Sequence, residues 1–336
     1  MGIDLTDQFK RPLRDLRISV TDRCNFRCRY CMPVEVFGAG YSFLPKEEIL
    51  RFGEIERITQ RFVRLGVSKI RLTGGEPLLR RDLSDLVARL AKIEGVNDIA
   101  MTTNAALLEK YAVDLKSAGL HRVTVSLDAL DAKVFGEMNG VGASPDKVIA
   151  GIDAALAAGL GVKVNAVIKR GVNDHEVVAL ADFARERAVS MRYIEYMDTG
   201  NVNGWKLDEV VPSHELLEIL KKEIALNKSK RVAGETAQRY EVEGEDGFEI
   251  GFISSVTQPF CSACNRARLS ADGKIFTCLF ASEGMDIKQF IREGASDEDV
   301  DKLLEGIWSN RNDNYSEQRS SLTENLPKAE MSYLGG

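Results

Sequence analysis

Short runs of apolar and β-branched residues alternate along the chain with longer segments in which apolar residues recur every three or four positions. The short runs predict strands at residues 15–20, 67–73, 98–103, 122–127, 162–168 and 190–197. The longer segments predict helices between the strands, for example at residues 46–65, 82–92, 145–158 and 175–187. Regular alternation of this kind is typical of a parallel sheet, so the pattern predicts an α/β fold in which six βα units form an open barrel.

The pattern changes after the sixth predicted strand. A helix at residues 213–222 and short strands within residues 240–253 follow, while the polar residues 309–329 predict no regular structure. We therefore assign residues 1–230 to the partial barrel and residues 231–336 to a C-terminal region.

Composition and charge narrow the class of protein. The chain has 336 residues, of which 44% are hydrophobic and 29% are charged, as is typical of a globular protein. Its formal net charge of −6 argues against bulk nucleic acid as the main partner, although local basic clusters can still bind an anion. The sequence contains no apolar run of about 18 residues and no apolar signal core at its start. We therefore expect a cytoplasmic protein with no membrane or nucleic-acid partner.

The six cysteines fall into two groups, which indicates two metal sites. Cys24, Cys28 and Cys31 have the spacing C-x3-C-x2-C in a loop after a predicted strand. Three thiolates can hold a four-iron cluster and leave one iron open to a ligand with amino and carboxylate groups. A structural zinc ion would require a fourth ligand, and none of the three histidines lies nearby in the sequence.

The second group consists of Cys261, Cys264 and Cys278, with the spacing C-x2-C-x13-C. The turn signal at residues 271–273 could fold the third cysteine back onto the first two. Three thiolates again suit a cluster with an open iron, but spacing alone leaves half of a zinc ribbon as the alternative.

Cations recur at matching positions of the predicted strands, where alternation would turn them into the barrel. These cations are Arg17, Lys69, Arg71, Lys163 and Arg192. Arg266 and Arg268 alternate between the cysteines of the second group, so both would face one side. Burying so many cations without an anion is unfavourable, which favours a polyphosphate ligand. The alternative is that some face solvent or pair with Glu195 or Asp198.

The first cysteine motif, with Tyr30 before its third cysteine, is followed after the next strand by Gly-Gly-Glu-Pro at residues 74–77. This combination resembles the radical SAM superfamily, in which a reduced 4Fe-4S cluster cleaves S-adenosylmethionine (SAM) to a radical that abstracts hydrogen from the substrate. The resemblance implies that SAM contacts Tyr30, Gly75, Ser126, Asn165 and Met197.

The second cysteine group, with Asn-Arg-Ala-Arg-Leu after Cys264, Leu after Cys278 and a terminal Gly335-Gly336, resembles the GTP 3',8-cyclase family of molybdenum cofactor biosynthesis over essentially the whole chain. The resemblance implies an incomplete (β/α)6 TIM-like barrel with a C-terminal α+β extension that carries a second 4Fe-4S cluster. In this family the C3' radical of GTP attacks guanine C8, which gives (8S)-3',8-cyclo-7,8-dihydroguanosine 5'-triphosphate.

The same resemblance implies roles for individual residues. Arg17, Arg266 and Arg268 would be the catalytic residues and would contact the triphosphate and ribose. Substrate binding would extend to Lys69, Arg71, Thr102, Lys163, Arg192 and Ala267. The Gly-Gly tail would reach into the active site. One departure is Ala105, where the family usually has glycine; a positive φ there would cost about 1 kcal/mol.

The resemblance also implies partners: a reduced flavodoxin or ferredoxin as electron donor, and cyclic pyranopterin monophosphate synthase as the next enzyme. The protein would be a monomer or a homodimer. Two alternatives are a radical SAM enzyme that matures peptides and a non-catalytic iron-sulfur scaffold or electron carrier. Modification of nucleic acid is disfavoured by the acidic total and by the absence of a separate basic, aromatic-rich domain.

Overall fold

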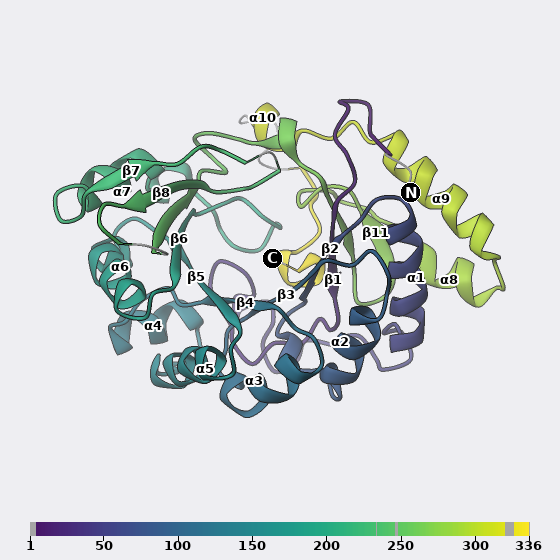
Figure 1. Cartoon of the computed structure of the whole chain (residues 1–336), viewed down its shortest axis with the longest axis horizontal. Helices are drawn as coiled ribbons and strands as arrows, with labels where there is room; N and C mark the ends of the chain where they lie inside the picture. Colours follow the sequence, from purple (N-terminus) through teal and green to yellow (C-terminus); the bar gives the residue numbers. More distant parts are fainter. Residues whose placement is uncertain (1–4, 233, 246–247, 320–325, 336) are drawn as a thin grey trace.

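The computed structural model describes residues 5–232, 234–245, 248–319 and 326–335. Its centre is formed by six strands: β1 (Asp15–Ser19), β2 (Lys69–Thr73), β3 (Asp98–Thr103), β4 (Arg122–Ser126), β5 (Gly161–Ile168) and β6 (Ser190–Glu195). The strands are parallel and pair in sequence order. The six predicted strands are thus confirmed, with ends that differ from the prediction by at most two residues. Figure 1 shows them curved around a central space.

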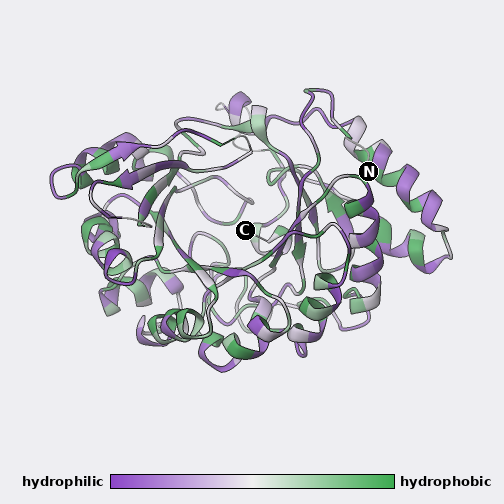
Figure 2. Ribbon diagram, viewed as in Figure 1, coloured by the Kyte–Doolittle hydropathy of each residue, from purple (hydrophilic) through white to green (hydrophobic). Residues whose placement is uncertain are grey.

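One helix follows each of the strands β1 to β5, with an additional helix between β4 and β5. These helices are α1 (Phe52–Arg64), α2 (Leu83–Ala91), α3 (Leu108–Ser117), α4 (Ala132–Asn139), α5 (Asp146–Ala157) and α6 (Val177–Glu186). They cover the outside of the curved sheet (Figure 1) and carry polar as well as apolar positions (Figure 2). In α1 the buried positions Ile55, Ile58 and Phe62 are three and four residues apart, so one face of the helix packs on the sheet.

The first predicted helix begins later than expected. Residues 46–49 form turns, and α1 begins at Phe52, where Glu54 accepts a hydrogen bond from the Arg51 amide at 2.7 Å. The preceding Leu50 amide donates instead to the Ala271 carbonyl. A tertiary contact with the C-terminal region therefore takes the backbone group that a longer helix would use.

The chain after β6 continues the sheet at both edges. The strands that it adds are β7 (Leu226–Lys228), β8 (Gln238–Val242), β9 (Glu249–Ile253), β10 (Arg266–Leu269), β11 (Lys274–Phe276) and β12 (Met285–Asp286), of which β7 lies before residue 231, in the part assigned to the barrel. Strand β10 pairs in parallel with β1, and β9 pairs in parallel with β6. The result is one sheet of twelve strands in the order β12-β11-β10-β1-β2-β3-β4-β5-β6-β9-β8-β7. Both cysteine groups are therefore attached to the same sheet.

The remaining helices are α7 (Ser213–Leu220), α8 (Ile287–Arg292), α9 (Asp297–Ser309), α10 (Tyr315–Gln318) and α11 (Met331–Leu334). Short 3-10 turns lie at Pro77–Leu79, Asp174–Glu176, Leu207–Glu209 and Cys261–Ala263. Helix α10 corrects the prediction for residues 309–329, because the Tyr315 ring stacks on Phe280 with centroids 4.4 Å apart. No helix among the described residues is long and apolar enough to cross a membrane.

The chain ends lie in different places. Figure 1 shows the N-terminal segment beside α9 and the C-terminal end inside the ring of strands.

Candidate active site

A cavity of about 850 Å³ lies inside the partial barrel. Its wall is built from the C-terminal ends and inward-facing positions of the barrel strands and from the segment around β10. All six cysteines are free thiols, and all six line this cavity. The two cysteine groups, far apart in the sequence, therefore face one shared cavity.

The first cysteine group lies in the loop after β1. The Cys31 and Met32 amides both donate to the Cys28 carbonyl, at 2.9 and 2.8 Å, which folds the motif into a tight turn. Burial raises the pKa of Cys24 to about 11, and burial with Asp128 and the two neighbouring thiols raises the pKa of Cys28. Crowded and buried in this way, the cysteines are unfavourable as thiolates unless a bound cation compensates their negative charge. They therefore fit an iron-sulfur cluster.

No group of three His, Cys, Asp or Glu side chains within the described part of the chain is arranged to hold a single metal ion. In a four-iron cluster each thiolate binds a different iron, so the ligands need not converge on one point. The arrangement therefore remains compatible with a cluster at each cysteine group.

The Gly-Gly-Glu-Pro segment packs directly on the first cysteine loop. A Cβ on Gly75 would lie 2.3 Å from the Arg23 carbonyl oxygen, and one on Gly74 would lie 2.4 Å from that of Thr21. The Gly75 amide donates to Thr21 and the Glu76 amide to Arg23. The glycines are thus required by the approach of two protein backbones, a role that the sequence did not indicate.

Glu76 is buried at the end of β2. It accepts hydrogen bonds from the Thr103 hydroxyl at 2.6 Å, the Asn104 amide at 2.7 Å and the Leu78 amide at 3.1 Å. Burial nevertheless raises the pKa of Glu76 to about 7. This carboxyl ties the ends of β2 and β3 together beside the cysteine loop.

The five residues expected to contact SAM all line the cavity: Tyr30, Gly75, Ser126, Asn165 and Met197. The Tyr30 hydroxyl donates to Asp128 at 2.8 Å, and burial raises the pKa of Asp128 to about 6. Tyr30 is therefore held in place across the barrel from the end of β4.

The second cysteine group lies at the other side of the cavity. Cys261 and Cys264 flank a 3-10 turn, and Cys278 follows β11. Burial alone would raise the pKa of Cys264, but Arg266 and Arg311 lower it to about 7. Burial raises the pKa of Cys278 to about 12.

Cations dominate the cavity wall. Twelve lysine and arginine side chains line it against six aspartates and glutamates, an excess of six positive charges in a chain whose net charge is −6. The seven cations singled out from strand alternation are all among them: Arg17, Lys69, Arg71, Lys163, Arg192, Arg266 and Arg268.

Four of these cations crowd together at β1, β2 and β10. Arg17 is paired in register with Arg71 on one side and with Arg268 on the other. Burial, followed by the charges of Arg268 and Arg71, lowers the pKa of Arg17 well below its usual range. The Nε atoms of Arg17 and Arg71 are buried without a hydrogen-bond partner among the described residues. A bound anion would accept hydrogen bonds from these buried donors and compensate their charge.

Other cations of the cavity have protein partners. Arg192 and Lys163 share Glu249, the latter at 3.9 Å, and Lys69 lies 3.8 Å from Asp98. The partners are thus not Glu195 and Asp198, which the sequence offered as alternatives. Glu195 accepts hydrogen bonds from Ser213, and Asp198 binds the C-terminal segment.

Strand alternation places two further residues on the inner face of the barrel. Arg122 and Thr124 lie on β4 at the same parity as the inward residues, and both line the cavity. Arg122 pairs with Asp98, while Arg71 Nη1 donates to the Thr124 hydroxyl and to the Thr102 hydroxyl, each at 3.1 Å. Thr102 and Thr124 together fix the position of the Arg71 side chain.

The chain is similar to known proteins over almost its whole length. The radical SAM superfamily profile matches residues 18–184, and the Molybdenum Cofactor Synthesis C profile matches residues 189–317. A GTP 3',8-cyclase of Acidothermus cellulolyticus is 49% identical, with 99% of each chain covered. A GTP 3',8-cyclase of Staphylococcus epidermidis is 47% identical, again with 99% of each chain covered.

The chain belongs to the GTP 3',8-cyclase family. Among solved structures, the SAM-bound form of Streptococcus suis SuiB is similar with a TM-score of 0.62 and 18% identity, covering 93% of this chain and 71% of SuiB. At that identity the likeness shows the fold alone, which is that of a radical SAM enzyme.

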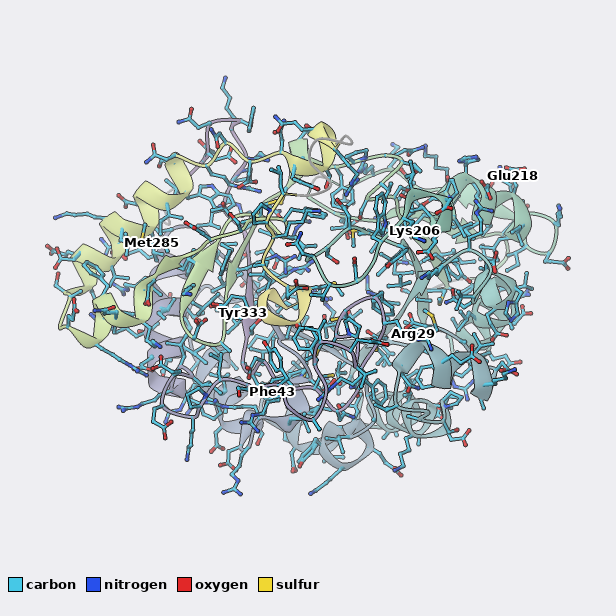
Figure 3. All side chains as sticks on the ribbon, turned by 180° about the vertical axis from the view of Figure 1, so that it is seen from behind. Arg29, Phe43, Lys206, Glu218, Met285 and Tyr333 are labelled. Carbon is cyan, nitrogen blue, oxygen red and sulfur yellow. The ribbon has the colours of Figure 1, made fainter. Side chains whose placement is uncertain are left out.

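The C-terminal tail of this cyclase-family chain enters the cavity region. The Ser19 hydroxyl donates to the Tyr333 carbonyl at 3.1 Å, and Arg268 Nη1 donates to the Gly335 carbonyl. A Cβ on Gly335 would lie 2.2 Å from Thr73 Cγ2, so only glycine fits there. Figure 3 shows Tyr333 on its short helix near the middle of the molecule. Gly336 lies outside the described residues.

Two further residues of this cyclase-family chain were singled out in its sequence, Ala105 as a departure from the family and Ala267 as a substrate-binding residue. Ala105 has a φ of 57°, so the position does adopt the left-handed conformation that favours glycine. Ala267 is buried in the core between Arg266 and Arg268 and does not line the cavity, because alternation turns its side chain to the outer face of the sheet.

Proposed function

We propose that this protein catalyses the 3',8-cyclisation of GTP. The observation that carries the proposal is the group of four guanidinium groups, Arg17, Arg71, Arg266 and Arg268, which line a cavity that two three-cysteine sites face. A triphosphate supplies several negative charges and accepts paired guanidinium hydrogen bonds, so it suits these four side chains.

When bound at the two sites, clusters held by Cys24, Cys28 and Cys31 and by Cys261, Cys264 and Cys278 would supply, with SAM, the hydrogen abstraction at C3' and the guanine-binding iron. The chain itself would position the reactants. Tyr30, Gly75, Ser126, Asn165 and Met197 would hold SAM beside the first cysteine group, and the four arginines would hold the triphosphate, with Lys69, Lys163, Arg192 and Thr102 around it. The product would be (8S)-3',8-cyclo-7,8-dihydroguanosine 5'-triphosphate.

The partial enclosure of the cavity also supports this assignment. Radical chemistry requires a site that excludes competing hydrogen donors, and the tail packed on Ser19, Thr73 and Arg268 closes part of the wall. Outside the cavity, we propose a reduced flavodoxin or ferredoxin as electron donor and cyclic pyranopterin monophosphate synthase as the enzyme that takes the product. We place the protein in the cytoplasm, as a monomer or a homodimer.

An anaerobic assay of the reconstituted protein with SAM, a strong reductant and GTP tests the proposal. Mass analysis is expected to show 5'-deoxyadenosine together with a cyclised product of the same mass as GTP. With GTP deuterated at C3', the deuterium is expected in the 5'-deoxyadenosine. Deoxyadenosine without a GTP product would refute GTP as the substrate, and a peptide would then be the next candidate. The absence of both products would refute the enzymatic assignment.

Matched variants connect the assay to the cavity. Arg17→Ala removes a buried guanidinium, and we expect at least a hundredfold loss of cyclised product with SAM binding retained. Arg64→Ala serves as the control, since the Arg64 side chain is 62% exposed on α1 and does not line the cavity. Equal activity of Arg17→Ala and Arg64→Ala would contradict the role of the arginine group.

A further inference from the structure

Three segments that are distant in the sequence meet behind the second cysteine group. They are the N-terminal segment with Asp7 and Arg11, the turn with Cys261 and Cys264, and the segment after α9 with Arg311. Arg311 is almost fully buried, with a side-chain exposure of 1%, and its guanidinium lies 4.6 Å from the centre of the Trp308 ring. Trp308 in turn donates to the Arg11 carbonyl at 3.1 Å. The guanidinium of Arg311 is therefore fixed in position by packing.

Arg311 grips one cysteine by two atoms. Its Nη1 donates to the Cys264 carbonyl at 2.8 Å, and its Nη2 donates to the Cys264 sulfur at 3.2 Å. Its Nε donates to Asp313 at 3.1 Å. The planar guanidinium thus spans the backbone and the sulfur of a single cysteine, which a lysine side chain cannot do.

Two acids provide the charge that keeps two arginines buried here. Asp313 lies 3.0 Å from Arg311 Nη2 and 3.9 Å from Arg11 Nη2. The second acid is Asp7, whose side chain is fully buried. Its carboxylate accepts from Arg11 Nε at 2.5 Å and lies 3.5 Å from Arg311 Nη1. Arg11 Nη1 donates to the Cys261 carbonyl at 2.9 Å. Both cysteines of the pair are therefore held through arginines that share one buried aspartate.

At the first cysteine group, the hydrogen-bond donors to sulfur among the described residues are neutral, and Tyr30 is the donor to Cys28. The Cys24 sulfur accepts from the Phe26 amide at 3.4 Å and the Asn104 side-chain amide at 3.8 Å, and both donors are neutral. The Cys278 sulfur accepts from the Phe280 amide at 3.4 Å. Among the described residues, Cys264 is the cluster-site cysteine whose sulfur accepts a hydrogen bond from a cation.

We propose that Arg311, held by Asp7, is a positioning residue that raises the reduction potential of the cluster at the second cysteine group. A hydrogen bond to a ligating sulfur, and a fixed positive charge beside it, stabilise the more negative reduced state. The inference rests on the cluster assignment proposed above. It adds that the two clusters differ in reduction potential because only the second has this arginine beside a ligating sulfur among the described residues.

The experiment is a potentiometric titration of the reconstituted full-length protein, followed by electron paramagnetic resonance, with the first cluster as internal reference. Two clusters are expected in the unaltered protein, and finding only one would refute the site assignment before any variant is made. In Arg311→Gln the second cluster is expected to shift at least tenfold toward the oxidised form, about 59 mV for one electron, while the first cluster stays unchanged. Arg64→Gln, at an exposed arginine, is expected to shift neither.

Arg311→Lys separates charge from geometry, because it keeps the charge but loses the two-atom grip; a smaller shift than in Arg311→Gln is expected. If Arg311→Gln does not retain the second cluster, the titration of Arg311→Lys decides. An unchanged potential in a variant that retains both clusters would overturn the proposal. Loss of the second cluster from both variants, with the first retained, would also overturn it, because Arg311 would then hold the site without a role in its potential.

Discussion

Ala105 and Ala188 offer a matched pair for measuring the cost of a left-handed alanine in this fold. Their φ angles are 57° and 51°, but Ala105 is fully buried after β3, whereas Ala188 is exposed after α6. At Ala105 the backbone is fixed by its amide, which donates to the Thr103 hydroxyl at 2.9 Å, and by its carbonyl, which accepts from Leu108 at 3.0 Å. Substitution by glycine removes the Cβ clash at both positions and leaves these backbone hydrogen bonds in place.

Two contributions to the change in unfolding free energy are common to both substitutions, and a third applies only to Ala105→Gly. Relief of the left-handed conformation gains about 1–2 kcal/mol, and the greater freedom of glycine in the unfolded chain costs about 0.4–1 kcal/mol. We therefore expect Ala188→Gly to stabilise the protein by about 0.5–1 kcal/mol. Ala105→Gly also removes a buried methyl group, which costs about 0.8 kcal/mol plus any cavity term. Its net effect is expected to be close to zero, about 1 kcal/mol less favourable than Ala188→Gly.

Urea unfolding of the reduced apoprotein under anaerobic conditions measures both changes. The midpoint is expected to rise for Ala188→Gly and to stay nearly constant for Ala105→Gly, with the same dependence of unfolding free energy on urea for all three proteins. If Ala105→Gly stabilises as much as Ala188→Gly, the buried methyl contributes nothing and the reasoning is wrong.

Three other substitutions test the packing and the charges. Gly151→Ala is expected to lower the unfolding free energy by about 1–3 kcal/mol despite a better helix propensity, because the new Cβ would lie 2.5 Å from the Ala105 carbonyl oxygen; a more stable variant would contradict the close contact of α3 and α5. Because burial raises the folded pKa of Glu76 to about 7, above its value of about 4.3 in unfolded chains, its contribution to stability is complete below that lower value and is lost as pH rises through about 7. Glu76→Gln should therefore flatten the fall of the unfolding midpoint between about pH 4 and 7, and parallel profiles would refute the shift. Asp198→Asn should speed proteolysis of the C-terminal segment at least severalfold, since Asp198 accepts from a tyrosine, an arginine and a lysine there; cleavage at the original rate would argue against this anchor.

The sequence predicted the barrel well because each strand is a local feature. Its six strands are short β-branched runs, and the alternation within them placed Arg17, Lys69, Arg71, Lys163 and Arg192 on the inside. Alternation depends only on the two-residue repeat of a strand, so it can be read without knowing the neighbours. The same reasoning would have added Arg122, which lies on β4 at the inward parity.

The pairing of these cations could not be predicted in the same way, because it depends on which strands become neighbours. Glu249 is on β9, which joins the sheet beside β6 only when the C-terminal region folds back, and there it meets Arg192 and Lys163. The excess of cations around Arg17 is equally non-local. Asp15 on β1 is an acid that acts on Arg17, but β10 places Arg268 in register with it, and Arg268, Arg71 and Arg266 outnumber that acid. One edge of the barrel therefore holds its cations in ion pairs with Glu249, and the other keeps an excess of cations. This asymmetry follows from the return of the chain to both edges of one sheet, and it is the reason why we propose the triphosphate site beside β1, β2 and β10.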